Sequence, residues 1–492
     1  MTAKTLNNAE NWKHLARWNG QGFYDLRTED LGDVPVRLFL TPNLLKEAED
    51  ILYRQIVNAT RFPGVKLVII TPDTHYGYGV PVGCVLITDV DGGAIAMGPV
   101  GYDIGCGMMS ARSTVPAELA TPEKKLKFNR AVMERVEMGA GGKSHRFGEL
   151  SKSEFNALVR GGAEFYVDKY GAAFDRSRAE RHRIPVDDDW DIPWGGRGRP
   201  ERGLNQLGSL GGGNHFIELQ RAEETGTLFV QVHTGSRGFG HGLATNYFDL
   251  ARENRPGEIK DLDLGYFTPD SVYYNDYLNA VAAGGNYAIL NRLIIFEQVS
   301  AAFKEVFRQE LELVYEISHN LVQRELNPEL GEVWVHRKGA TRAFPAQHPS
   351  LVGTLWEETG HPVLIPGSNK DYSYILQPLP GAANSGYSVN HGAGRRLSRG
   401  EANRTLSQRK MDDEYKAAGI LVNLDGRVPL DEAAPAYKSS EEVIRAVVEA
   451  GLAEIKYTLW PLASLKGVDE RKGARRNKPK DNIKEKRTTR HF

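Results

Sequence analysis

Cysteine is nearly absent from this chain, and so are the long apolar segments that mark membrane and secreted proteins. The 492 residues include two cysteines, Cys84 and Cys106, which excludes a disulfide framework and any zinc site built from four thiolates. No run of about 18 apolar residues occurs, and the first residues contain no apolar signal region. We therefore expect a cytoplasmic protein with no membrane partner.

An excess of basic charge is also lacking, since the formal net charge is −1. A nucleic acid would have to be bound through a local patch. The phosphate-binding pattern GxxxxGK[ST] is absent, because the stretch "GAGRR" lacks its lysine–hydroxyl pair. Glycine, in contrast, is abundant at 52 residues and gathers in short clusters. Such clusters are typical of a backbone that approaches a ligand or another segment closely.

The order of apolar and polar segments predicts an α+β fold, a single large domain of mixed and antiparallel sheets packed against helices around a central cleft. Strands are expected at 34–40 and 65–75 and at several short places within 333–400, and helices at 42–60, 120–180, 273–326 and 440–458. The domain is expected to span residues 1–467, with an exposed insertion at 181–203. Residues 468–492 are basic and predict a disordered tail, with contact to a polyanion as the less favoured alternative.

The stretch "VGYDIGCGM", residues 100–108, places the carboxylate of Asp103 and the thiol of Cys106 on one glycine-rich turn. The pair is either ordinary loop chemistry or two metal ligands on a bent chain. His215 in "GGGNHFIE" and His233 in "VQVHTGSRGFGH" stand at similar junctions of a strand and a glycine turn. Carboxylates suit Mn²⁺, imidazole and thiolate suit Zn²⁺ or Co²⁺, and a thiolate can bridge two ions. A closed structural zinc site is the alternative.

Cationic side chains follow several histidines. A guanidinium matches phosphate oxygens bidentately, and the "HGAGR" stretch offers consecutive N–H groups for an anion. A histidine beside such a nest can attack phosphorus. His319, in the helix expected at 273–326, lies off its apolar stripe, where a polar side chain is usually solvated. Spacing alone predicts a metal-dependent phosphoryl or nucleotidyl transferase. The cationic side chains that follow histidines are Arg237 after His233, Arg337 and Lys338 after His336, and Arg395, Arg396 and Arg399 after His391.

A series of motifs runs in a characteristic order from residue 34 to residue 467. They are "TPDTHYGYGVPVG", "GYDIGCGM", "LGSLGGGNHFIE", "VHTGSRGFGH", "SHN", "HRKGATRAFP", "PVLIPGS", "HGAGRRLSR" and "PLASLKG". In this order they resemble the RtcB family of RNA-splicing ligases. The resemblance covers nearly the whole chain, and it implies the fold of that family with a central metal and nucleotide cleft.

The resemblance implies an RNA ligase that uses GTP and two Mn²⁺ ions. It joins an RNA 3′-phosphate, or a 2′,3′-cyclic phosphate after opening, to a 5′-hydroxyl end. His391 is the implied site of guanylylation; the guanylate then passes to the RNA 3′-phosphate, and attack by the 5′-hydroxyl expels GMP. The implied roles are tRNA splicing and RNA repair, and an archease-type activator is a candidate partner.

Site residues carried over from the family fall into three groups. The implied metal ligands are Asp103, Cys106, His215, His233 and His319, with the Cys106 thiolate shared between the two ions. The implied nucleotide contacts are Asn214, Phe216, Glu218, Ser368, Ser373, His391, Gly392, Ala393, Gly394 and Lys466. The implied contacts to phosphates or RNA are Arg237, Arg395 and Arg399. Hydrogen bonds from Glu218 and Lys466 to guanine edges would favour GTP over ATP.

Two segments depart from the family pattern. Residues 369–372 read "NKDY" where the family usually has "MGTA", and the loop before His391 has no cysteine. Both are expected beside the guanine pocket, so a divergent paralogue with altered nucleotide or RNA-end specificity is an alternative. A metal-dependent phosphodiesterase without a nucleotide adduct and a non-catalytic RNA- or metal-binding protein are the others.

Overall fold

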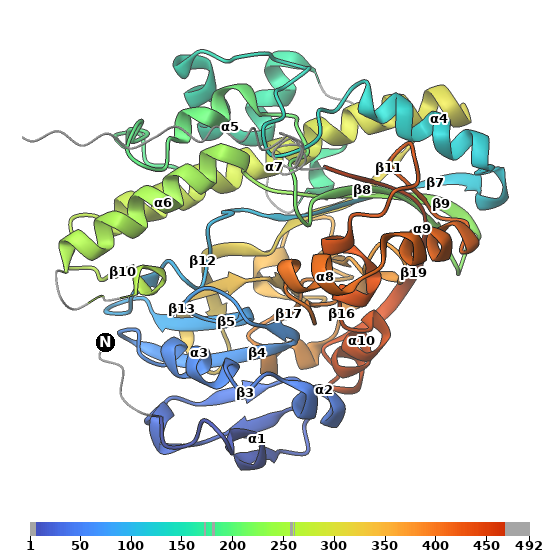
Figure 1. Ribbon diagram of the computed structural model, residues 1–492. Coiled ribbons are helices and arrows are strands. Elements are labelled where there is room, and N and C mark those ends of the chain that lie inside the picture. Colours follow the sequence, from blue (N-terminus) through green and yellow to red (C-terminus); the bar gives the residue numbers. More distant parts are fainter. Residues whose placement is uncertain (1–5, 172–173, 180–182, 256–258, 260, 468–492) are drawn as a thin grey trace, which may run out of the picture.

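Two large β-sheets and a layer of helices make up the protein, in a computed structural model that describes residues 6–171, 174–179, 183–255, 259 and 261–467 (Figure 1). The predicted α+β class and single domain are confirmed. The tail expected at 468–492 lies outside the described residues. None of the helices in the described ranges combines the length and apolar character that crossing a membrane requires.

The first sheet has seven strands, and all neighbours are antiparallel except the third and fourth. In spatial order they are β1 (Ala16–Trp18), β2 (Tyr24–Leu26), β3 (Val36–Leu38), β4 (Val65–His75), β5 (Val82–Asp89), β13 (Gly331–Lys338) and β12 (Asn320–Asn327). β4 and β5 are almost continuously buried, as expected for strands covered on both faces.

The second sheet has eight strands and carries most of the glycine-rich turns. In spatial order they are β11 (Glu312–Ser318), β7 (Gly107–Pro116), β9 (Thr227–Thr234), β8 (Phe216–Ala222), β19 (Ala453–Lys466), β16 (Ser373–Pro378) and β15 (Val363–Ile365), with β18 (Leu421–Val422) parallel to β19. Two small sheets pair β6 (Ile95–Ala96) with β10 (Tyr266–Phe267), and β14 (Ala340–Arg342) with β17 (Ser388–Asn390).

A long central helix, α7 (Tyr274–Phe307), packs on β7, β9 and β11 of the second sheet. Most of its side chains are buried all round, which is typical of a helix inside a core. It is flanked by α4 (Pro122–Met133), α5 (Lys152–Tyr170) and α6 (Arg237–Asn254), seen together at the top of Figure 1. The remaining helices are α1 (Trp12–Leu15), α2 (Pro42–Glu47), α3 (Leu52–Ala59), α8 (Arg399–Thr405), α9 (Gln408–Ala417) and α10 (Ser440–Glu449).

The predicted helix over 273–326 is wrong in its second half. α7 ends at Phe307, because Arg308 adopts a left-handed φ of 62°. The residues that follow form β11 and β12, whose apolar side chains fit a period of two as well as one of 3.6. Pairing of β11 with β7 and of β12 with β13 favours the strands over a helix. His319 therefore lies in a tight turn between two strands.

Four other expectations are modified. The helix expected at 42–60 is divided into α2 and α3, and residues 134–151 between α4 and α5 are not helical. The helix expected at 440–458 ends at Glu449, and its second part begins β19. In the segment expected to be an exposed insertion, 187–189 are exposed, whereas three side chains are buried in the largest core cluster: Val186, Trp190 and Ile192.

Candidate active site

Strand register brings several distant segments to one end of the second sheet. The candidate metal ligands lie at or beside the ends of those strands. Pairing of the strands therefore also brings their side chains together. Cys106 directly precedes β7, His215 precedes β8 and His319 follows β11. The paired residues at this end are Gly107 with Ser318 and Thr234, and Phe216 with His233 and Lys466.

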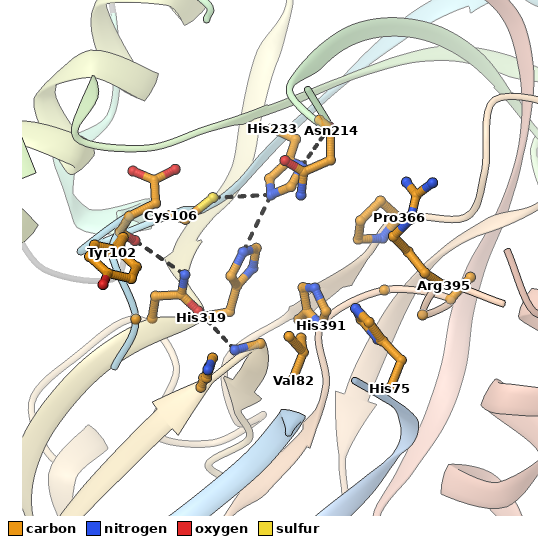
Figure 2. A pocket seen from close by; sticks show the side chains of 18 of the residues that line it. His75, Val82, Tyr102, Cys106, Asn214, His233, His319, Pro366, His391 and Arg395 are labelled. Atoms are coloured by element: carbon orange, nitrogen blue, oxygen red, sulfur yellow. Dashed lines mark hydrogen bonds between the residues drawn. The ribbon is translucent and has the colours of Figure 1, made fainter. Parts of the chain in front are cut away.

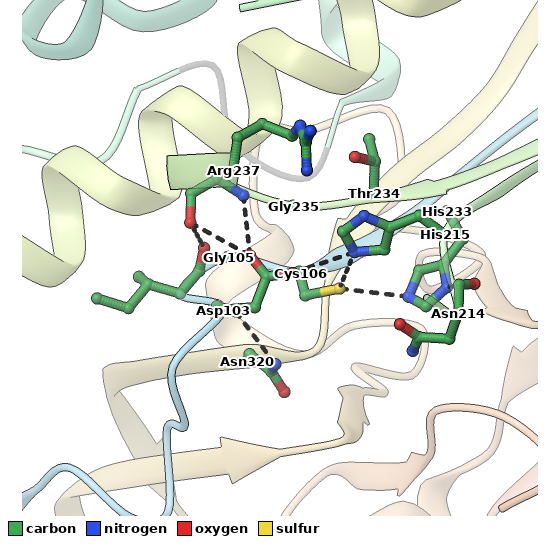
Figure 3. A network of polar contacts seen from close by, with 12 residues as sticks. Asp103, Gly105, Cys106, Asn214, His215, His233, Thr234, Gly235, Arg237 and Asn320 are labelled. Atoms are coloured by element: carbon green, nitrogen blue, oxygen red, sulfur yellow. Dashed lines mark hydrogen bonds and ion pairs between the residues drawn. The ribbon is translucent and has the colours of Figure 1, made fainter. Parts of the chain in front are cut away.

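The five residues expected to bind metal do come together: Figure 3 shows Asp103, Cys106, His215 and His233, and Figure 2 shows His319 with Cys106 and His233. The Cys106 sulfur lies 3.5 Å from His215 Nε2 and 3.3 Å from His233 Nε2. His319 Nε2 lies 3.3 Å from His233 Nε2, and Asp103 Oδ2 lies 3.1 Å from His215 Nε2. These donors form two groups, each within 4.8 Å, and Cys106 belongs to both. Such spacing is close to that of neighbouring ligands around one ion.

Backbone contacts hold two of the imidazoles with their Nε2 atoms toward the sulfur. His215 Nδ1 contacts the Leu210 carbonyl oxygen at 3.1 Å, and His233 Nδ1 contacts that of Asn214 at 3.0 Å. This arrangement is the usual way in which a protein orients a metal-binding imidazole. Burial lowers the pKa of His233 well below its ordinary value, which keeps the ring neutral and able to bind metal.

The turn that carries Asp103 and Cys106 depends on glycine. Gly101 and Gly105 have φ angles of 86° and 74°, in the region that other residues rarely adopt. A Cβ at Gly235 would lie 2.4 Å from Asp103 Oδ1, so the two segments can approach this closely only without a side chain there. Desolvation raises the pKa of Asp103, but the hydrogen bond and charge of His215 outweigh it and bring the pKa to about 2.

Arg292 of α7 ties three site segments together from inside the core. It is fully buried and pairs with the equally buried Glu316. Its guanidinium also donates to the Gly105 carbonyl at 2.7 Å, the Thr234 carbonyl at 2.9 Å and Ser318 Oγ at 2.7 Å. Each acceptor is within one residue of a candidate ligand. The buried charge thus fixes the relative positions of β7, β9 and β11.

We expect Arg292→Met to lower the free energy of unfolding by about 3–5 kcal/mol, because it leaves the charge of Glu316 buried without its partner. Arg112→Met is a matched control, since Arg112 of β7 pairs with Glu312 of β11, the strand that also carries Glu316, but both side chains are more than 40% exposed. Its cost is expected to be about 1 kcal/mol or less. Urea denaturation compares the two variants, and equal losses would contradict this role for Arg292.

His391 follows β17 and lies beside the donor cluster (Figure 2). Its ring centroid is 4.8 Å from that of His319, in an edge-to-face arrangement. Its Nδ1 lies 2.6 Å from Asp73 Oδ2, which also accepts from the backbone N–H groups of His391 and Gly392. The two segments that carry Asp73 and His391 can approach this closely because residue 394 is a glycine. A Cβ at this position would lie 2.1 Å from the Asp73 carbonyl oxygen.

Asp73 is an ionised carboxylate at the end of β4. It is fully buried, and burial alone raises its pKa, but the charge and hydrogen bond of His391 bring the pKa below its ordinary value. Thr71 Oγ1 donates to the other carboxylate oxygen at 2.6 Å. An ionised acceptor at Nδ1 holds the proton on that nitrogen and leaves His391 Nε2 with a free lone pair.

A cavity of about 320 Å³ joins the donor cluster to His391 and to cationic side chains. Lys466 Nζ lies 5.3 Å from the centroid of the Phe216 ring, and Arg399 is about half exposed at the rim. Arg395 is held by Glu432 and Tyr437. Of the expected nucleotide and phosphate contacts, those that line the cavity are Asn214, Phe216, Ser368, His391, Gly392, Ala393, Gly394, Arg395, Arg399 and Lys466.

The remaining expected contacts lie behind this wall. Glu218 is buried, accepts from Gln220 at 2.8 Å and has a pKa that burial raises to about 7. Ser373 Oγ accepts from the Gly367 N–H at 3.0 Å. Arg237 is buried and donates to Ser209 Oγ and to the Gly139 carbonyl. None of these three residues is among those that line the cavity, and their contacts to nucleotide or phosphate stay predictions.

The anion-binding role expected for the "HRK" stretch does not fit its contacts. His336 is fully buried, with Nδ1 on the Leu86 carbonyl and Nε2 accepting from the Ala96 N–H. Arg337 forms a buried ion pair with Glu325. Lys338 reaches the cavity wall, but its Nζ donates to two backbone carbonyls.

Sequence reasoning omitted Asp73, Asn320 and His75 from the site. Asp73 contacts His391 directly, and Asn320 bridges the Asp103 carbonyl and the Gly339 N–H. His75 lines the cavity two residues after Asp73. The sequence did contain a signal for Asp73 and His75, because "TPDTH" is a polar, charged end to a buried strand. Asn320 is the last residue of the "SHN" motif, but it was not singled out because the segment was taken for a helix.

Comparison with known proteins agrees with this geometry. Residues 55–467 match the family described as "tRNA-splicing ligase RtcB". The tRNA-splicing ligase RtcB of Pyrobaculum aerophilum is 36% identical over 467 residues, which cover 88% of this chain and 95% of that protein. The tRNA-splicing ligase RtcB of Thermococcus kodakarensis is 35% identical over 463 residues, with 88% and 95% covered. The RNA-splicing ligase RtcB of Mycobacterium tuberculosis is 36% identical over 439 residues, with 84% and 100% covered.

Proposed function

The chain belongs to the RtcB family of tRNA-splicing ligases and is an RNA ligase, and from this premise we propose that it joins RNA 3′-phosphate or 2′,3′-cyclic phosphate ends to 5′-hydroxyl ends with GTP and Mn²⁺. One observation carries the proposal. His391, with Nδ1 held by a buried carboxylate, lies next to a cluster of sulfur, carboxylate and imidazole donors. A nucleophile and a candidate metal centre thus share one cavity.

His391 Nε2 is the proposed nucleophile of the first step. It attacks the α-phosphorus of GTP, so an N–P bond forms as the bond to the pyrophosphate oxygen breaks and pyrophosphate leaves. The ring becomes positively charged, and the carboxylate of Asp73 at Nδ1 stabilises that charge without taking the proton. The backbone at Gly392, Ala393 and Gly394 lines the cavity on the same side.

Two transfers complete the reaction. An oxygen of the RNA 3′-phosphate attacks the same phosphorus, the N–P bond breaks and His391 is regenerated. The RNA 5′-hydroxyl oxygen then attacks the phosphorus of the 3′-phosphate, GMP leaves, and the hydroxyl proton is released. A 2′,3′-cyclic phosphate must first take up water to give the 3′-phosphate. Arg395 and Arg399 line the cavity and would bind these phosphates.

The donor set fits divalent metal ions. Asp103, Cys106 and His215 would hold one ion, and Cys106, His233 and His319 would hold the other. Burial, and then the charge of Asp103, raises the pKa of Cys106, so metal binding would have to displace a proton. When bound, Mn²⁺ would supply positive charge that neutralises the triphosphate and the phosphates in transfer.

Joining of RNA strands with defined ends tests the proposal. The 3′ end is varied among phosphate, cyclic phosphate and hydroxyl, the 5′ end between hydroxyl and phosphate, and each pair is incubated with each of the four nucleotides and with Mn²⁺, Mg²⁺, Zn²⁺ or Co²⁺. We expect joining only for a 3′-phosphate or cyclic phosphate with a 5′-hydroxyl, with GTP and Mn²⁺. Equal joining with ATP and CTP would instead identify a divergent paralogue, and cleavage without nucleotide would identify a phosphodiesterase.

A further inference from the structure

The cavity has two ends of different chemistry. Figure 2 shows Tyr102 and Arg395 far apart, with His391 between them. At the Arg395 end, the cations Arg395, Arg399 and Lys466 all pair with the single buried carboxylate of Glu432. The Tyr102 end is aromatic and contains Tyr78, Phe248 and the carboxylate of Asp263. The proposed reaction gives the cationic end phosphates to bind, but it leaves the aromatic end without a role.

Tyr78 is an exposed ring on an anchored backbone. Its side chain is 67% exposed, although its carbonyl oxygen accepts from Lys338 Nζ at 2.5 Å and from the Val80 N–H at 2.7 Å. Exposure of one aromatic ring is common and carries little by itself. Here, however, Tyr78 lines the cavity that contains His391, as well as a neighbouring cavity.

A rigid aromatic stack supports Tyr78 from one side. The Tyr78 and Tyr102 rings meet edge to face, with centroids 6.2 Å apart and planes at 89°. Tyr102 stacks on Phe248 with centroids 4.6 Å apart, and its hydroxyl donates to Asp263 at 2.8 Å. The support is therefore fixed in position while most of the Tyr78 ring faces solvent and the cavity. A fixed, exposed aromatic face is the platform on which proteins stack unpaired bases.

Charge decides which RNA end fits here. Apart from the candidate metal ligands, the aromatic end contains one carboxylate, Asp263, and one cation, Lys338, whose ammonium is engaged by backbone carbonyls. A terminal phosphate is disfavoured beside the Asp263 carboxylate. A 5′-hydroxyl end carries no terminal phosphate, whereas the 3′-phosphate end matches the cationic wall. Resting on the proposed function, we propose that Tyr78 stacks the base of the 5′-hydroxyl terminal nucleotide and so positions its hydroxyl beside the metal and histidine cluster.

The test compares a 5′-hydroxyl RNA that has a normal first nucleotide with one whose first nucleotide lacks its base. Joining rates are measured over a range of strand concentrations for wild type, Tyr78→Ala, Tyr78→Phe and Tyr76→Ala. Tyr76→Ala is the matched control. Tyr76 lies in the same loop and is 53% exposed, but it lines a neighbouring cavity and not the cavity that contains His391. Quenching of 2-aminopurine at the first nucleotide measures stacking without any joining.

We expect Tyr78→Ala to raise the KM for the normal strand about tenfold to a hundredfold, the range typical of lost base stacking. The normal strand should then lose its advantage in joining over the abasic strand. Tyr78→Phe and Tyr76→Ala should keep that advantage, and quenching should disappear only in Tyr78→Ala. The inference is overturned if Tyr78→Ala still prefers the normal strand, or if wild type joins the normal and abasic strands equally well. Failure of the proposed function would appear separately, as wild type that quenches 2-aminopurine but joins no strands.

Discussion

Cys106→Ala is expected to abolish RNA joining and to empty the metal centre. Cys106 is the one donor common to both candidate ligand groups, and its sulfur lies within 3.5 Å of two imidazole nitrogens. Without it, each group retains two protein ligands. Because charge stabilisation by a bound metal is worth several kcal/mol, we expect the joining rate to fall by about 10³-fold or more.

Cys84→Ala is the matched control for this prediction. Cys84 is the other cysteine of the chain and is equally buried, but it belongs to the apolar core under β5. Its replacement should leave metal content unchanged and joining close to that of wild type. Metal content is measured by mass spectrometry after dialysis against Mn²⁺-free buffer. Full metal retention and joining in Cys106→Ala would show that the cluster is not the metal centre.

Asp73→Asn is expected to slow transfer of the nucleotide to His391 by about 10²–10⁴-fold, the range seen when a buried carboxylate that orients a catalytic imidazole loses its charge. The amide keeps the shape of the carboxylate, but it cannot stabilise the positive ring, and its NH₂ group favours the proton on Nε2. Nucleotide affinity should change little, because Asp73 contacts His391 and not the cavity.

Rapid-quench labelling with radioactive GTP separates these two effects. The rate at saturating GTP should fall, whereas the half-saturating concentration should stay within a few-fold of wild type. Thr71→Val provides the comparison, since Thr71 contacts the carboxylate oxygen of Asp73 that His391 does not. It should show a much smaller loss. Wild-type labelling rates in Asp73→Asn would mean that His391 does not depend on its buried partner.

How much of the site the sequence could predict depends on how local each signal is. Asp103 and Cys106 share one short turn, and His215 and His233 each stand beside a glycine turn, so their residue types and spacing identified them. Folding then joined the segments through strand register, in which Gly107 pairs with both Ser318 and Thr234. Which of the distant strands become neighbours cannot be read from the residue types and spacing of any one segment.

The predictions that were wrong, and the residues that were missed, are those whose structure or contacts depend on a segment distant in the sequence. The segment 312–327 carries apolar residues that suit a helix or a strand, and only pairing with β7 and β13 makes it a strand pair. Likewise, nothing beside Asp73 in the sequence indicates that it will meet His391, which is 318 positions away. Arg237 and Glu218 stay predicted contacts to phosphate and guanine, and their burial is a tertiary property that the sequence does not indicate.

The account requires above all that His391 becomes covalently attached to the nucleotide beside a metal cluster. The most direct measurement is peptide mass spectrometry of the protein after incubation with GTP and Mn²⁺, before RNA is added. We expect one GMP adduct, located on the peptide that contains His391 and absent when Mn²⁺ is withheld. An adduct on a different residue, or unmodified protein under conditions in which RNA is joined, would contradict the account.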